Sequence, residues 1–159
     1  MELIFEIDGQ NALFYSVQGE HYIVVEYLVK ELQVNLEKKT RKGQTPLSLA
    51  CEIGDIDIIK LLCVNGANIF NTLSEFVQRN EPEIVRILVQ HGKLSPKNFE
   101  LIQRNPLHEA ILNDSVKIST LLIKHLPWLT KCPDFDGCKP CDLITVNTNP
   151  RISSLIDTF

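Results

Sequence analysis

The chain has 159 residues, 44% of them hydrophobic and 23% charged, with a formal net charge of −4 at pH 7. No apolar run approaches the roughly 18 residues that a membrane span requires, so we expect a soluble protein without a membrane partner. The mild acidity argues against a nucleic-acid partner, because neutralising phosphates requires a basic stripe.

The start of the chain and its cysteines indicate a reducing compartment. Glu2 and Glu6 stand where a secretory signal would place Lys or Arg. The five cysteines are an odd number, and Cys51, Cys63 and Cys141 fall at apolar-face positions. This favours buried free thiols over a disulfide framework. We therefore expect a cytoplasmic location, with the nucleus as the alternative.

The first predicted helical pair lies within residues 9–39. Leu13 and Ser16 share one face of its first helix, and the second helix carries its apolar residues at positions 24, 25, 27 and 28. Acidic residues accompany Tyr22 and Tyr27 on this second helix, which is typical of a terminal unit with one face toward water.

The second predicted pair, within residues 40–69, has the clearest boundaries. Thr45 can cap a helix that has Pro46 in its first position, and Gly54 ends that helix. Asp55 can cap the next helix, for which Gly66 supplies a left-handed end. The apolar positions repeat those of the first pair 34 residues further on: Leu47, Ala50, Cys51, Ile58, Ile59, Leu61 and Leu62.

The third and fourth pairs, within residues 70–94 and 101–130, continue the pattern at unequal spacing. Leu73 follows Leu47 by 26 residues, whereas Leu107 follows Leu73 by 34. About eight residues are therefore missing before Leu73, which predicts that the third unit lacks the hairpin of the others.

The fifth unit, within residues 134–157, is the weakest copy. Residues 137–142 begin the pattern again, with Cys141 at the buried position that Leu107 occupies in the fourth unit. The second helix of this unit is reduced to residues 151–156. Before the fourth unit, Ser95 and Pro96 predict the start of a short extra helix.

The residues Gly43-x-Thr45-Pro46-Leu47-x-x-Ala50, followed by Leu61-Leu62-x-x-x-Gly66-Ala67, resemble the ankyrin repeat. The resemblance implies an all-α solenoid of about five helix-turn-helix repeats in a single domain, residues 1–159, with short hairpin fingers and none in the third repeat. The implied boundaries are 9–39, 40–69, 70–94, 101–130 and 134–157.

Three departures from the ankyrin pattern predict weaker caps. The third repeat has no Thr-Pro-Leu-His segment at all. Ser48 replaces the usual His and Asn105 replaces the usual Thr, so we expect a loss of about 1 kcal/mol where a cap is missing. We expect burial between repeats for Leu47, Ala50, Ile58, Leu61, Leu62, Ile84, Leu88, Leu107, Ala110, Leu121 and Leu122.

The resemblance implies a non-catalytic protein-protein interaction module, acting as an adaptor, a targeting subunit or an inhibitor. No phosphate loop, nucleophile elbow or zinc-protease helix is present in the sequence. We expect no enzyme activity, no cofactor and a monomer with a protein partner. One alternative is a host-directed viral or bacterial protein that masks a host signalling factor.

A second alternative is a small-ligand or metal site in the C-terminal segment. Cys132, Cys138 and Cys141 have spacings compatible with zinc, but a fourth ligand is not nearby. Asp134 and Asp136 are more typical of a hairpin turn than of a metal site. We expect no metal, with one buried thiol, Cys141, and two exposed ones, and we expect His108 to support the hairpin beside it.

The predicted binding surface follows the fingers and the exposed ends of the inner helices. Four cations between Lys38 and Lys42 make the first finger a candidate contact for an acidic patch on the partner, with a solvated tip as the alternative. Ile53 is expected to be exposed, and Phe135 to be an anchor on the last finger unless it folds onto its neighbour. The full set is Gln18, Arg41, Lys42, Gln44, Glu52, Ile53, Gln78, Arg79, Arg104, Leu112, Asn113 and Phe135.

Overall fold

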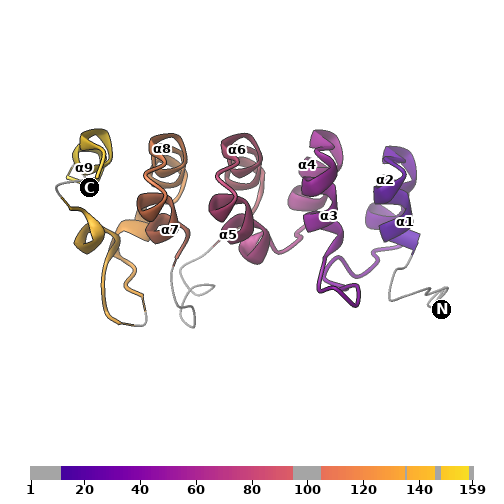
Figure 1. The fold of residues 1–159 in the computed structure, drawn as a ribbon. Coiled ribbons are helices and arrows are strands. Elements are labelled where there is room, and N and C mark those ends of the chain that lie inside the picture. Colours follow the sequence, from indigo (N-terminus) through magenta and orange to yellow (C-terminus); the bar gives the residue numbers. More distant parts are fainter. Residues whose placement is uncertain (1–11, 95–104, 135, 146–147, 158–159) are drawn as a thin grey trace. The chain divides into compact units, whose positions relative to one another are not determined.

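The computed structural model describes residues 12–94, 105–134, 136–145 and 148–157, and these ranges contain helices and no strand. The predicted all-α class is therefore confirmed (Figure 1). None of the described helices is long and apolar enough to cross a membrane. The elements are α1 (Ala12–Gln18), α2 (Tyr22–Lys30), α3 (Pro46–Ile53), α4 (Ile56–Val64), α5 (Phe70–Gln78), α6 (Pro82–His91), α7 (Pro106–Leu112), α8 (Val116–His125), the 3-10 helices η2 (Pro127–Lys131) and η3 (Pro140–Leu143), and α9 (Pro150–Ile156).

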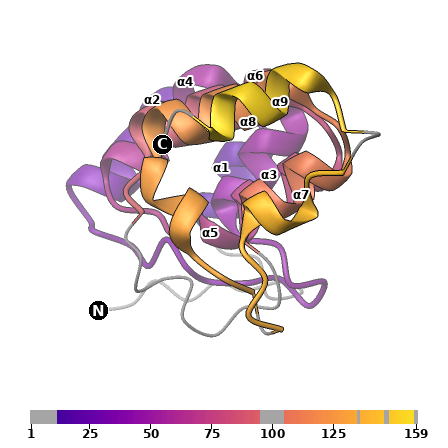
Figure 2. The same ribbon diagram turned by 90° about the vertical axis from the view of Figure 1, so that its left-hand side faces the viewer.

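The chain forms two compact units. The first spans residues 1–69 with 91–93 and contains α1 to α4, and the second spans residues 70–90 with 94–159. In the first unit α1 packs against α3 and α2 packs against α4, so two layers of two helices enclose its core. In the second unit α5 packs against α7 and α8 packs against α9 (Figure 2).

The helices of the second pair begin and end where the sequence predicts. Thr45 Oγ1 accepts a hydrogen bond from Ser48 N at 3.2 Å, and Ser48 Oγ accepts one from Thr45 N at 2.9 Å. This reciprocal capping box replaces what the missing His would supply, so the expected weak cap at α3 is wrong. Gly54 ends α3 with a φ of 85°, and Gly66 follows α4 with a φ of 95°, both in the left-handed region.

The start of α7 is also better capped than predicted. Asn105 Oδ1 accepts from Leu107 N at 2.9 Å and from His108 N at 3.3 Å. Asn is among the best capping residues, so the substitution for Thr removes no cap. At the other irregular point of the chain, α4 ends at Val64 and α5 begins at Phe70, which confirms that the third repeat lacks its finger.

Two predicted core residues are only half-buried, Ile84 in α6 and Leu121 in α8. The buried stripe of α6 includes Val85 and Leu88, three residues apart, and that of α8 includes Ile118 and Leu122, four residues apart. Leu121 lies at the edge of its stripe, whereas Ile84 lies in the first turn of α6. The other predicted core residues are buried: Leu47, Ala50, Ile58, Leu61, Leu62, Leu88, Leu107, Ala110 and Leu122.

The fifth repeat is shorter than the sequence predicts. Residues 140–143 form a single 3-10 turn rather than a full α-helix, whereas the reduced second helix is present as α9. The extra helix predicted at Ser95 and Pro96 lies outside the described residues.

Candidate partner-binding surface

The first finger, residues 37–44, is closed by hydrogen bonds around Thr40. Thr40 N donates to Gln44 O at 2.9 Å, and Gly43 N donates to Thr40 O at 2.9 Å. Thr40 Oγ1 accepts from Gln44 N at 3.2 Å. Gly43 has a φ of 81°, a conformation that side chains with a Cβ rarely adopt. The finger is therefore a defined turn.

Side chains also connect the two ends of this finger to the first unit. Glu37 Oε1 accepts from Asn68 N at 2.7 Å, a contact between residues 31 positions apart. Gln44 Nε2 donates to Glu52 Oε2 at 2.7 Å, which connects the finger to the last turn of α3. Sequence reasoning included Gln44 and Glu52 in the surface but missed Glu37, because no local pattern indicates its distant partner.

The predicted residues of the first unit lie mostly at the surface. Arg41, Lys42 and Glu52 are exposed, and Gln44 is half-buried. The predicted exposure of Ile53 is wrong, because this last residue of α3 is half-buried. Gln18, at the C-terminal end of α1, is exposed.

The predicted residues of the second unit are exposed but already engaged within their own unit. Arg79 forms an ion pair with Glu75 at 2.6 Å, and its guanidinium lies 5.1 Å from the centroid of the Phe76 ring. Asn113 Nδ2 donates to Val77 O at 3.4 Å. Gln78 and Leu112 are exposed. The structure thus places the predicted residues in two groups, one in each unit, and Arg104 and Phe135 lie outside the described residues.

His108 has the supporting role that the sequence predicts. Its side chain is buried, and its Nε2 lies 2.9 Å from Cys138 O. Asn105 adds a second support, because its Nδ2 donates to Leu129 O at 3.3 Å and to Cys132 O at 2.9 Å. Two side chains at the start of α7 therefore hold the segment that leads into the fifth repeat.

The C-terminal cysteines differ from the predicted arrangement. Cys141 is exposed rather than buried, because residues 140–143 form only one 3-10 turn, and Cys132 and Cys138 are half-buried. Burial raises the pKa of the Cys132 thiol. Among the described residues, no three His, Cys, Asp or Glu side chains are grouped so that they could hold a metal ion.

Asp134 acts as the sequence predicts, as a turn residue. Its Oδ1 accepts from Asp136 N at 3.0 Å and from Cys138 N at 2.9 Å. The carboxylate therefore closes the turn of its own hairpin.

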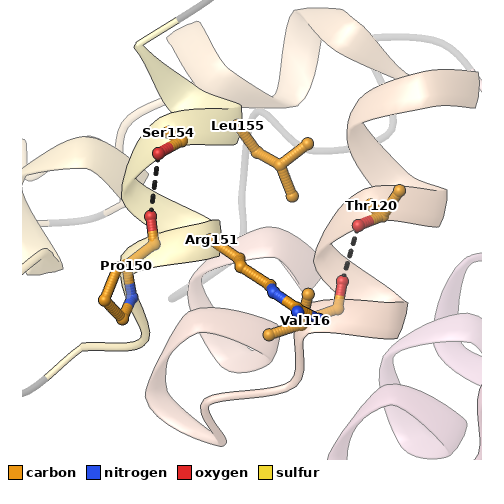
Figure 3. A pocket seen from close by; sticks show the side chains of 6 residues that line it. All are labelled: Val116, Thr120, Pro150, Arg151, Ser154 and Leu155. Carbon is orange, nitrogen blue, oxygen red and sulfur yellow. Dashed lines mark hydrogen bonds between the residues drawn. The ribbon is translucent and has the colours of Figure 1, made fainter.

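An open groove of about 450 Å³ between α8 and α9 was not predicted (Figure 3). The polar groups on its walls are turned toward their own helices: Thr120 Oγ1 donates to Val116 O at 2.7 Å, and Ser154 Oγ donates to Pro150 O at 3.0 Å. The groove is therefore mainly apolar, with Arg151 as its charged residue. Its lining is Val116, Thr120, Pro150, Arg151, Ser154 and Leu155.

Capped helical pairs that recur along the chain, with hairpin turns between some of them, define an all-α repeat protein. Residues 2–72 match the family model described as ankyrin repeats in three copies. A solved structure, the crystal structure of the ankyrin repeat protein EF0377, has a TM-score of 0.67 at 17% sequence identity and covers 96% of this chain and 80% of its own. At this identity the likeness shows the fold.

Relatives by sequence are also named as ankyrin repeat proteins. One from Acanthamoeba polyphaga mimivirus is 28% identical over 137 residues, 81% of this chain and 17% of the relative. One from Fowlpox virus (strain NVSL) is 28% identical over 168 residues, 96% of this chain and 48% of the relative. The ankyrin repeat and KH domain-containing protein mask-1 of Caenorhabditis elegans is 32% identical over 100 residues, 58% of this chain and 4% of the relative.

Residues 2–72, a little less than half of the chain, therefore resemble ankyrin repeats, and the solved structure extends the likeness in fold to most of the chain. The chain spans less than half the length of each of these three relatives. Ankyrin repeats are generally protein-protein interaction modules, and the fold is generally non-catalytic.

Proposed function

We propose that this chain is a non-catalytic binding module that contacts a protein partner through the first finger and the exposed ends of the inner helices. The observation that carries the proposal is the first finger itself. It displays Lys39, Arg41 and Lys42 at the surface on a turn whose two ends are hydrogen-bonded to the rest of the unit. Ordered, exposed and charged side chains favour rapid, specific encounter with a partner of opposite charge.

Depending on its partner, the module acts as an adaptor, a targeting subunit or an inhibitor, since each of these roles needs only a binding surface. The mimivirus and fowlpox relatives support one version of this role, in which the chain masks a host protein. The thiols of Cys51 and Cys63 are buried and not joined in a disulfide, which supports a reducing, cytoplasmic location.

Affinity capture with quantitative comparison of variants tests the proposal. The test variant combines Arg41→Glu with Lys42→Glu. The control combines Lys60→Glu with Arg86→Glu, two cations on the outer helices α4 and α6 that each form an ion pair on their own helix. The two variants change the net charge equally, so only the position of the change differs.

We expect a protein that the parent and the control capture to be lost from the test variant. With that protein purified, the test variant should associate more slowly than the control at low salt, and the difference should shrink as salt screens the charges. If the control loses the partner and the test variant keeps it, the outer helices form the binding surface and the proposed surface is wrong.

A further inference from the structure

The first finger has the opposite charge to the rest of the chain. Residues 37–44 contain four cations and one carboxylate, a net charge of +3 within a chain whose net charge is −4, so the remaining residues carry −7. Lys39, Arg41 and Lys42 are exposed, and Lys38 is half-buried. The positive region is therefore a short segment of a chain whose other residues carry a net negative charge.

Both ends of the finger are anchored by hydrogen bonds to carboxylates. Glu37 accepts a hydrogen bond from the backbone of Asn68 at 2.7 Å, and Glu52 accepts one from the Gln44 side chain at 2.7 Å. These bonds fix the first and last residues of the finger to the unit. These hydrogen bonds hold the loop in one conformation, which lowers the entropy cost of ordering it on binding.

We infer that the first finger is a pre-organised recognition loop for a short acidic peptide segment of the partner. This inference rests on the proposed function and names the chemistry of the partner. A short acidic segment fits better than a nucleic acid. The Debye length at physiological salt is about 8 Å, so the finger attracts only charges that lie close to it. A duplex carries a charge every ~1.7 Å along its axis and would extend past the finger along a chain whose other residues carry a net charge of −7, whereas a short peptide can end within the finger.

Fluorescence anisotropy with a labelled peptide of alternating Glu and Gly tests the charge requirement. The parent should bind the peptide with an affinity that falls as salt rises. Lys39→Glu with Lys42→Glu should weaken binding by more than about tenfold. The matched control is Lys30→Glu with Lys60→Glu, which changes the same charge on α2 and α4 of the same unit and should bind within about threefold of the parent.

Two outcomes of this experiment would overturn the inference. If the control variant loses as much affinity as the finger variant, the attraction is a property of overall charge and not of the finger. If a duplex oligonucleotide of similar charge binds the parent more tightly than the peptide, the finger recognises nucleic acid instead.

Substitutions at Glu37 test the pre-organisation separately from charge. Glu37→Ala removes a negative charge and the acceptor for Asn68 N, so charge alone predicts tighter binding of the acidic peptide. We expect instead a loss of about three- to tenfold, because the loop must be ordered on binding. Glu37→Gln removes the same charge but keeps an acceptor oxygen, and it should bind at least as tightly as the parent. Tighter or unchanged binding by Glu37→Ala would show that the anchor is irrelevant.

Failure of this inference can be told apart from failure of the proposed function. If the acidic peptide does not bind but a captured partner binds the parent through other residues, the chain is a binding module with a different recognition surface. If neither a partner nor the peptide binds, both are wrong.

Discussion

Helices α2 and α4 of the first unit carry the same apolar pattern 34 residues apart, yet they bury it differently. Ile58 and Leu61 of α4 are 0% and 7% exposed, whereas Val24 and Tyr27, at the matching positions of α2, are 48% and 56% exposed. Helix α4 has α2 beside it, but among the described residues of this unit no further outer helix lies beyond α2. Periodicity therefore identifies the face that can stack, and the neighbouring helix decides whether that face is buried.

The two helices also begin differently. Asp55 caps α4 by accepting from Asp57 N at 3.1 Å and from Ile58 N at 3.0 Å. His21 occupies the same position before α2 and makes no side-chain cap hydrogen bond. The first helical pair is thus less well fixed than the second both at its helix end and on its stacking face.

The largest expected effect is at Leu61. Leu61→Ala should lower the free energy of unfolding by about 2–5 kcal/mol, because it removes buried methylene groups and leaves a cavity between helices. Urea denaturation followed by circular dichroism would measure the change. Val64→Ala, on the exposed side of the same helix, is the control and should have little effect. Equal losses for both variants would contradict the assigned face.

Because Cys63 is buried, the free energy of unfolding should fall as the pH rises into the alkaline range. Burial raises the pKa of its thiol from 9.0 to about 12. Between these values the unfolded chain loses the proton and the folded chain keeps it, so stability falls as pH rises, by ~1.4 kcal/mol per pH unit at most. We expect the parent to lose about 1 kcal/mol more than Cys63→Ala between pH 8 and pH 10 in urea denaturation.

This pH dependence also distinguishes the two helices, since α2 has Val29 at the position of Cys63. The comparison uses the change with pH within each variant, so the cavity that Cys63→Ala creates cancels. A parent and a variant with identical pH dependence would show that the thiol is accessible to water in the folded chain.

Removing the cap of α4, or adding a cap to α2, should reduce the difference in stability between the two helical pairs. Asp55→Ala should cost about 1 kcal/mol, the usual effect of a lost N-cap. His21→Asp should instead stabilise the chain by roughly 0.5 kcal/mol, because it adds an acceptor and a negative charge at the start of α2. Thermal unfolding of both variants measures these changes. Destabilisation by His21→Asp would mean that the backbone before α2 does not permit a cap.

The smallest expected effect is at Tyr27. Tyr27→Ala should change the free energy of unfolding by no more than about 0.5 kcal/mol, as for other surface substitutions, although it matches Leu61 in register. Denaturation should be repeated at several protein concentrations. A loss as large as that of Leu61→Ala would show that this face is covered in solution, and a dependence on concentration would identify another copy as the cover.

Local sequence rules accounted for most helix boundaries and for the repeat register. Thr45, Pro46, Gly54, Asp55 and Gly66 all have the roles that their residue types predict, because caps and left-handed ends depend on bonds within a few residues. The first finger was also recognised from a local feature, its run of charged residues. Its partner-binding role stays a proposal.

Only the tertiary structure decided which predicted faces are buried and which distant groups meet. Cys141 is exposed because its helix shortens to one turn, and Glu37 meets Asn68 across 31 residues. At the start of α7, His108 and Asn105 reach the segment leading into the fifth repeat, whereas Ser48 at the start of α3 bonds only locally. The chain's residue types determine what each group can bond to, but burial and long-range bonds depend on where the neighbouring helices and turns lie.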